Sequence, residues 1–178
     1  MDEKLLEIIN SYKDFNNYET VKTEILKLGY NISGEGSGRI VFKINDELVL
    51  KVAKNDFGFQ QNCKEYTKYQ EFKTYPVINV TFDIFNNGYC ISAEYLTPLT
   101  AEAFSKIYWV SFSYFKAFLI VDNKKLIIPK KCKQHTKDLI TNANEFFSKS
   151  GLNRKEILRP NQWGLTPDNN AKIIDYGK

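Results

Sequence analysis

The spacing of apolar positions changes several times along the chain, and each change predicts a different element. Between residues 2 and 28 apolar side chains recur at helical spacing, which predicts one or two amphipathic helices. Gly29 is a plausible helix stop. From residue 30 to 52 the apolar residues alternate with polar ones, which predicts strands with a turn at Asn45-Asp46.

The middle of the chain predicts one more helix and a hairpin. Residues 55–58 suggest a break, and 60–72 are helix-competent with aromatic residues at three-residue steps. Two strands are expected at 80–85 and 89–96. The turn between them, Asn86-Asn87-Gly88, contains an Asn-Gly pair, which is typical of a hairpin.

After a linker at Thr97-Pro98, the sequence predicts mainly helices. Thr100 can cap a helix that starts at Ala101, and the segment 101–119 is unusually rich in aromatic residues, which predicts a helical core or an interface. A second helix is expected at 136–149 with Gly151 just past its end, and a short hairpin at 163–175.

Composition and charge exclude several classes of function. With 178 residues, 43% of them hydrophobic, the chain can bury one core or two small lobes. The net charge of +4 is mild, and the lysine-rich stretch 124–133 has no interleaved aromatics, which argues against nucleic acid as a partner. His135 is the only histidine, which argues against histidine-dependent triads and zinc sites. The three cysteines are far apart, and no membrane-length apolar run or signal-type start is seen, so we expect a cytoplasmic protein without a membrane span.

The candidate chemistry lies in a glycine-rich stretch and in the strand that follows it. Gly34, Gly36 and Gly38 separate two apolar segments, and successive backbone N–H groups of such a loop can cradle phosphate. Lys51 lies in the middle of the apolar run 48–53, and a buried lysine needs an anion or a carboxylate nearby. A flexible hairpin, and a lysine whose ammonium reaches water, are the alternatives from these residues alone.

In this order the segments resemble the first half of a protein kinase. The stretch Gly34–Val41 resembles the glycine loop, with Arg39 where a third glycine often sits. The stretch Val49–Ala53 resembles the strand with the ATP-binding lysine, and Glu65 is the best match to the helix glutamate that pairs with it. The resemblance implies nucleotide-binding roles for Gly34, Gly36, Ser37, Gly38, Arg39, Lys51 and Glu65.

Two later segments extend the resemblance. Ala93–Leu96 resembles the gatekeeper and hinge, which implies that the backbone of Glu94 and Leu96 binds adenine. Ile173–Gly177 resembles the strand and the magnesium-binding Asp-Phe-Gly, with tyrosine in place of phenylalanine. The ligands implied by the resemblance are therefore ATP and Mg²⁺, with Asp175 and Gln162 as metal ligands.

The catalytic loop departs from the kinase pattern. Placing Pro160 at the position of the usual loop proline puts Ile157 at the catalytic aspartate and Gln162 at the metal-binding asparagine. Isoleucine can neither accept a proton nor orient a hydroxyl group. A shifted register puts Glu156 and Asn161 at these positions instead, but it breaks the proline match.

The resemblance implies an α+β, protein-kinase-like fold. An antiparallel β N-lobe with one helix would lead through a hinge to a truncated, mostly helical C-lobe with a short β-hairpin. The expected parts are an N-terminal helical extension (1–28), the N-lobe (29–96) and the C-lobe (97–178), without an activation segment or a platform for a peptide substrate. The chain is also similar to small kinase-like proteins of bacterial viruses, which would place it in the host cytoplasm.

The function expected from this resemblance is binding of ATP and magnesium with weak or no phosphoryl transfer. The protein would then act through a protein partner, with the aromatic segment 101–119 as a candidate surface. One alternative is an active atypical kinase that uses Glu156 as its base. A further alternative is an interaction or structural module that has lost nucleotide binding.

Overall fold

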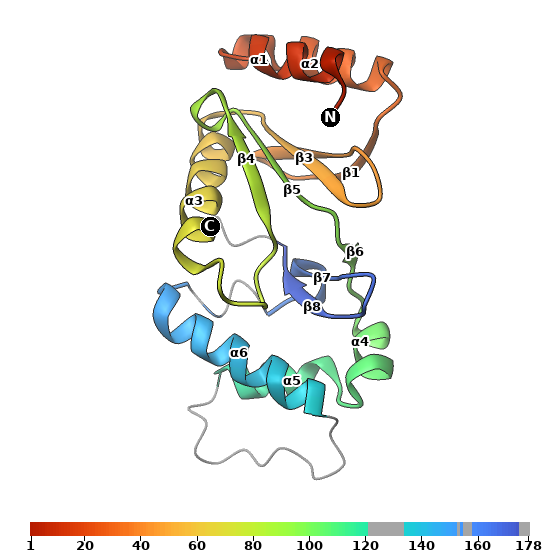
Figure 1. Cartoon of the computed structure of the whole chain (residues 1–178), viewed down its shortest axis with the longest axis vertical. Coiled ribbons are helices and arrows are strands. Elements are labelled where there is room, and N and C mark those ends of the chain that lie inside the picture. The colour runs from red at the N-terminus through yellow and green to blue at the C-terminus, as the bar shows by residue number, and fades with distance from the viewer. Residues whose placement is uncertain (121–133, 153, 155–157, 175–178) are drawn as a thin grey trace. The chain divides into compact units, whose positions relative to one another are not determined.

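The computed structural model describes residues 1–120, 134–152, 154 and 158–174 (Figure 1). These residues have a mixed α+β fold with six α-helices, a five-stranded sheet and a three-stranded sheet. They form two compact units: unit 1 contains Met1–Glu71 and Val80–Tyr95, and unit 2 contains Phe72–Asn79 and the described residues of Leu96–Tyr176. Within the described ranges, no helix is both long and apolar enough to cross a membrane. The three-part division at 28 and 96 stays a prediction.

Unit 1 is built on an antiparallel sheet with the strand order β1-β2-β3-β5-β4. The strands are β1 (Asn31–Glu35), β2 (Arg39–Lys43), β3 (Leu48–Ala53), β4 (Thr81–Phe85) and β5 (Cys90–Glu94). Lys51 of the central strand lies opposite Val41 on one side and Ile91 on the other. Because side chains alternate along a strand, Lys51 and Arg39 lie on the same face of the sheet.

The opposite face of this sheet carries the apolar core of unit 1. Two N-terminal helices, α1 (Glu3–Ser11) and α2 (Tyr18–Lys27), pack there, so the predicted amphipathic helices are confirmed. Asp2 caps α1, its Oδ1 accepting from the N–H of Leu5 at 2.8 Å. The shared cluster contains Leu5, Ile9, Tyr12, Tyr18, Val21 and Ile25 from the N-terminal segment and Ile40, Phe42, Leu50, Val52 and Cys90 from the strands.

The third helix, α3 (Asp56–Phe72), begins earlier than expected from the sequence. Residues 55–58 were expected to form a break. In the structure, Asn55 Oδ1 accepts from the N–H of Gly58 at 3.1 Å. This is the bond of a helix N-cap, so the polar, glycine-containing segment starts the helix instead of interrupting it.

The hairpin predicted between β4 and β5 is confirmed, although its turn is longer than a two-residue Asn-Gly turn. The turn is a short 3₁₀ segment, Asn86–Gly88, and all three of its residues have positive φ, between 46° and 135°. Asn86 Nδ2 donates to the carbonyl oxygens of Ile9 and Tyr12 at 2.7 and 3.0 Å, which anchors the turn to α1.

Unit 2 contains three helices, α4 (Ala101–Tyr108), α5 (Phe112–Ile120) and α6 (Gln134–Ser150). Thr100 caps α4 as expected, its Oγ1 accepting from the N–H of Ala103 at 3.1 Å. The aromatic segment is divided at Trp109, whose φ of 59° ends α4. Among the described residues, the buried aromatic side chains of unit 2 form a large part of its core: Phe72, Phe104, Tyr108, Phe112, Phe115, Phe118, Phe146, Phe147 and Trp163. The prediction of a helical core is therefore confirmed, whereas Trp109 is 61% exposed.

The three-stranded sheet of unit 2 contains one strand that the sequence did not predict. The expected tail hairpin is present as β7 (Trp163–Leu165) and β8 (Ala171–Ile173). The presumed linker forms β6 (Thr97–Pro98), which pairs with β7. A strand of two residues has no recognisable periodicity, so the sequence did not predict this pairing.

Candidate functional site

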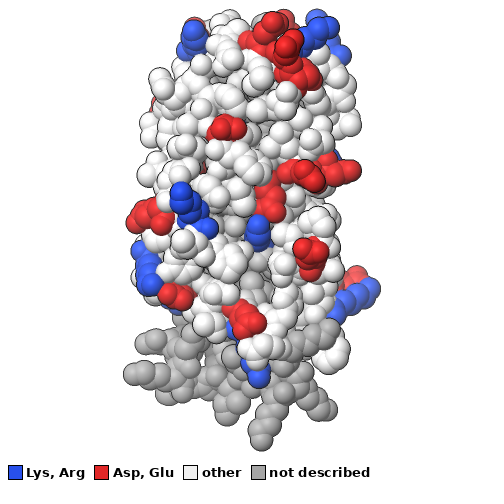
Figure 2. Space-filling view, viewed as in Figure 1, with Lys and Arg blue, Asp and Glu red and all other residues white. Residues whose placement is uncertain are grey.

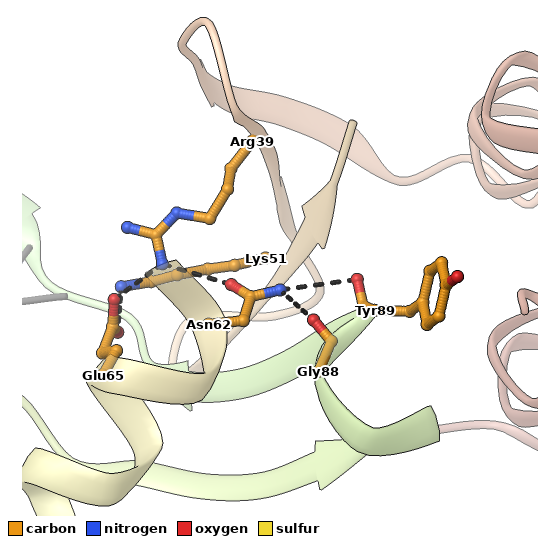
Figure 3. Close-up of polar contacts among 6 residues, drawn as sticks. All are labelled: Arg39, Lys51, Asn62, Glu65, Gly88 and Tyr89. Carbon is orange, nitrogen blue, oxygen red and sulfur yellow. Dashed lines mark hydrogen bonds and ion pairs between the residues drawn. The ribbon is translucent and has the colours of Figure 1, made fainter. Parts of the chain in front are cut away.

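The candidate site of unit 1 is centred on an ion pair between the central strand and α3 (Figure 3). Lys51 Nζ of β3 contacts Glu65 Oε1 of α3, and the two residues are 2% and 0% exposed. The local sequence explains both positions. Leu50 and Val52 point into the apolar cluster, so Lys51 points to the other face of the strand, where α3 lies. The structure therefore brings these two predicted residues together.

A second cation binds the same carboxylate. Arg39 Nη1 of β2 lies 2.8 Å from Glu65 Oε2 and 3.2 Å from Asn62 Oδ1. Arg39 is only 8% exposed. Two positive side chains thus share one buried carboxylate, an arrangement in which the loss of that carboxylate is far more costly than at the surface.

Asn62 links this group to the β4–β5 turn (Figure 3). Its Nδ2 donates to the carbonyl oxygen of Gly88 at 2.8 Å and to that of Tyr89 at 3.4 Å. Asn62 is fully buried and lies one helical turn before Glu65, so both side chains face the sheet. We call Arg39, Lys51, Asn62 and Glu65 the buried polar network.

The glycine loop is a tight turn between β1 and β2, closed by a bond from the N–H of Gly36 to the carbonyl oxygen of Arg39 at 2.8 Å. Its other carbonyl groups are bound to the segment before α3. Asn55 Nδ2 donates to Ser37 O at 3.0 Å, and the N–H of Lys54 donates to Gly38 O at 2.7 Å. None of these bonds uses the N–H groups of Ser37 and Gly38, which are the donors that a phosphate needs.

Gly38 and Gly58 allow this turn to lie directly on α3. A Cβ atom on Gly58 would stand 1.8 Å from the carbonyl oxygen of Gly38, a distance that no side chain tolerates. A Cβ atom on Gly34 or Gly36 would meet no atom closer than 3.9 Å. A Cβ atom on Gly38 would itself lie 3.0 Å from the backbone nitrogen of Gly58, so packing requires the third glycine of the loop but not the first two.

An ion pair lies beside the turn. Lys54 Nζ is 2.6 Å from Glu35 Oε1 and 3.3 Å from the carbonyl oxygen of Gly36. The hydrogen bond from Lys54 is the main cause that lowers the pKa of Glu35 below its ordinary value of 4.5, and the charges of Lys22 and Lys54 add to it. Glu35 therefore stays ionised under neutral conditions and holds Lys54 against the loop.

The two predicted adenine-binding positions lie where β5 ends. The N–H of Glu94 donates to Val80 O at 2.9 Å, and the N–H of Tyr95 donates to Glu47 O at 2.8 Å. The carboxylate of Glu94 also accepts from the N–H of Val80 at 3.4 Å. Leu96 is buried and belongs to unit 2.

Of the predicted catalytic and metal-binding residues, Gln162 alone lies in the described part of the chain. It ends a 3₁₀ turn (Pro160–Gln162), and its buried Oε1 accepts no hydrogen bond from the residues that the structure describes. A buried amide oxygen without a donor fits a hard cation such as Mg²⁺, which binds oxygen ligands. Glu156 and Asp175 lie outside the described residues. In the described ranges, no three His, Cys, Asp or Glu side chains are grouped as a metal site would require.

On the face in Figure 2, basic side chains of the described residues are scattered among acidic and uncharged ones. The predicted absence of nucleic acid among the partners stays a prediction.

Sequence reasoning missed two members of the site. Asn62 carried a usable signal, because it lies three residues before Glu65 and therefore shares its helix face. Gly58 carried none, since its contact with Gly38 depends on how the hairpin folds back onto α3.

Comparison of this chain with family models and with curated proteins finds no match.

Proposed function

We propose that the protein is kinase-like and binds ATP with Mg²⁺, that unit 1 contributes the phosphate-binding groups, and that it transfers phosphate weakly or not at all. The observation that carries this proposal is the Lys51–Glu65 ion pair between β3 and α3, on a sheet whose neighbouring hairpin ends in a glycine turn. The order of these parts is the one that the resemblance to protein kinases implies.

Each group has a separate task in this proposal. The ammonium of Lys51 offers a point charge to the phosphates, and Glu65 fixes its position. Arg39 adds a guanidinium group, which suits phosphate oxygens through paired N–H donors. The N–H groups of Ser37 and Gly38 add neutral donors at the turn.

The magnesium ion would be held by Gln162 Oε1 and by the carboxylate of Asp175. The buried Oε1 of Gln162, which accepts no hydrogen bond from any described residue, supports the first ligand. The second rests on the resemblance. When bound, the ion neutralises phosphate charge, while the protein supplies position and donors.

Weak catalysis follows from the favoured register of the catalytic loop, which places Ile157 where a base is needed. A radiolabelled-ATP assay tests this part of the proposal. We expect no incorporation above background, either into the protein itself or into generic protein substrates. Incorporation that the Glu156→Gln substitution abolishes would instead establish an active kinase with Glu156 as its base.

Calorimetric and thermal-shift titrations with Mg-ATP test nucleotide binding, with Lys51→Met as the site variant. Lys43→Met is the matched control, because Lys43 lies on the neighbouring strand and pairs at the surface with Asp46 at 2.7 Å. We expect binding in the wild type and in the control and a loss of at least about tenfold in Lys51→Met.

Because Lys51→Met can impair folding, a ¹⁵N-labelled wild-type titration serves as a second measurement. Mg-ATP should move the amide signals of Gly36 to Arg39 and of Lys51. Absence of heat, of thermal shift and of amide changes at millimolar Mg-ATP would end the nucleotide proposal.

A second candidate function is supported by the same network. Arg39 and Lys51 both bind Glu65 within the protein itself, and Asn62 satisfies neighbouring backbone groups. A network satisfied in this way can be purely structural, in a module that only binds a partner. The titrations decide between the two, since this module would show no nucleotide response.

A further inference from the structure

Unit 2 contains a pocket of its own, with a volume of about 360 Å³. One face of α6 supplies His135, Asp138, Leu139 and Asn142, the end of α4 supplies Tyr108, and β8 supplies Lys172. Tyr108 and Leu139 are buried, Asn142 is half-buried and Asp138 is exposed. The pocket therefore has an apolar base and a polar rim, and its volume lies in the range of about 300–1,000 Å³ typical of small-molecule sites.

The walls of this pocket are fixed by internal bonds. Tyr108 Oη donates to Asn169 O at 3.1 Å and accepts from the N–H of Ala171 at 2.7 Å. Thr136 Oγ1 donates to Tyr108 O at 2.7 Å, which ties α6 to the end of α4. The His135 ring stacks on the Tyr108 ring with centroids 4.7 Å apart and an angle of 9°. A ligand would therefore meet preformed walls and lose little affinity to ordering them.

The polar rim combines opposite charges. Asp138 lines the pocket and its carboxylate already accepts one bond from Gln134 Nε2 at 2.8 Å, and Lys172, a basic residue with contacts of its own, is also part of the lining. A carboxylate has lone pairs for further donors, and an ammonium group has three donors, so each can bind a ligand in addition to its present contacts. A singly charged ligand would match one of these groups and oppose the other.

We propose that this pocket binds a free amino acid with an apolar side chain. Its ammonium group would bind Asp138, its carboxylate would bind Lys172, and its side chain would lie against Leu139 and Tyr108. Asn142 would orient the polar end through its amide. This site lies entirely within unit 2, so the inference stands or falls independently of nucleotide binding in unit 1.

An NMR titration of the ¹⁵N-labelled full chain tests the ligand class. The probes are L-leucine, N-acetyl-L-leucine, which lacks the ammonium charge, L-leucinamide, which lacks the carboxylate, and adenosine. We expect L-leucine to move the amide signals of residues 135–142 and 170–172 and to bind at least about tenfold more tightly than the other three. Equal or tighter binding of either blocked leucine would assign the pocket to a peptide terminus instead, and preference for adenosine would also overturn the proposal.

Asp138→Asn is the site variant, because it removes the charge while keeping the size of an exposed side chain. Glu145→Gln is its matched control on the same helix, since Glu145 pairs at the surface with Lys149 and does not line the pocket. L-Leucine affinity should fall by at least about tenfold in Asp138→Asn and stay unchanged in Glu145→Gln. No response of the wild type to L-leucine at millimolar concentration, or equal affinity in both variants, would refute the site.

Discussion

The two units bury very different side chains. In unit 1, one face of the central sheet covers an apolar cluster, and the other covers Arg39, Lys51, Asn62 and Glu65. In unit 2, the core is aromatic, with Phe115 against Phe104 and Trp163 at centroid distances of 5.0 and 5.3 Å. One side of the unit 1 sheet thus depends on matched charges, whereas the core of unit 2 depends on size and shape.

The difference indicates that the stability of the fold does not by itself account for the buried residues of unit 1. Apolar side chains of similar volume can often replace a buried ion pair without loss of stability, so stability alone does not explain the network of unit 1. Packed aromatic pairs do contribute directly, at about 0.5–1.5 kcal/mol each beyond the area that they bury. The buried charges of unit 1 are therefore candidates for a role beyond stability, whereas the packed aromatic pairs of unit 2 stabilise the fold.

The largest effect is expected from removing the shared carboxylate. Glu65→Gln keeps the size of the side chain but leaves two buried cations without their counter-charge, so the free energy of unfolding should fall by about 3–5 kcal/mol. Urea unfolding measures the change. Glu71→Gln is the control, because it makes the same substitution at an exposed position of α3.

A triple variant sharpens this result. Changing Arg39, Lys51 and Glu65 together to methionine removes every charge of the network, and most of the lost stability should return. If Glu65→Gln behaves like Glu71→Gln, the network is not a determinant of stability in unit 1, and the contrast between the units fails.

The next effect concerns the glycine turn. Gly58→Ala forces a methyl group onto the carbonyl oxygen of Gly38, so the turn must move away from α3, at a cost of about 1–3 kcal/mol. Gly34→Ala is the matched control, because its Cβ would meet no atom closer than 4.0 Å. Urea unfolding gives the cost, and the amide signals of Gly36 to Gly38 report the movement. An equal effect of both variants would show that the close approach of the two glycines is not needed.

A smaller effect is expected in the aromatic core. Phe115→Leu keeps the residue apolar and removes part of its volume, which should lower the free energy of unfolding by about 1–2 kcal/mol. If buried charge matters more in unit 1 than shape does in unit 2, Phe115→Leu should lower the free energy of unfolding by less than Glu65→Gln in the same urea experiment. A larger loss in Phe115→Leu would mean that shape in unit 2 matters more than charge in unit 1.

The smallest effect is expected from the Glu35–Lys54 ion pair beside the glycine turn, whose contribution to the stability of the fold should depend on pH in the acid range. The pKa of Glu35 is lower in the folded protein than its ordinary value of 4.5, so its bond to Lys54 stabilises the fold above that value and is lost as the pH falls through the folded pKa. The wild type should exceed Glu35→Gln slightly in unfolding midpoint at about pH 6, and the difference should shrink as the pH falls below 4.5. A difference that persists in acid would contradict the role of this ion pair.

Local patterns in the sequence were sufficient for most elements. The helical spacing before Gly29, the alternation around Ile40 and Phe42, and the Asn-Gly turn all predicted elements that the structure contains. They also singled out Lys51, because a charge inside an apolar run is visible without any knowledge of its neighbours. Such signals depend on residues a few positions apart, which interact in nearly the same way in any fold.

Only the tertiary structure decided what surrounds Lys51. The convergence of Arg39 and Lys51 on one carboxylate depends on the register of β2 against β3, and the bonds of Asn62 depend on the turn at Gly88. The pocket of unit 2 joins residues of α4, α6 and β8 that lie far apart in the chain. No local pattern encodes such contacts, because strand register and helix packing are set by the whole core at once.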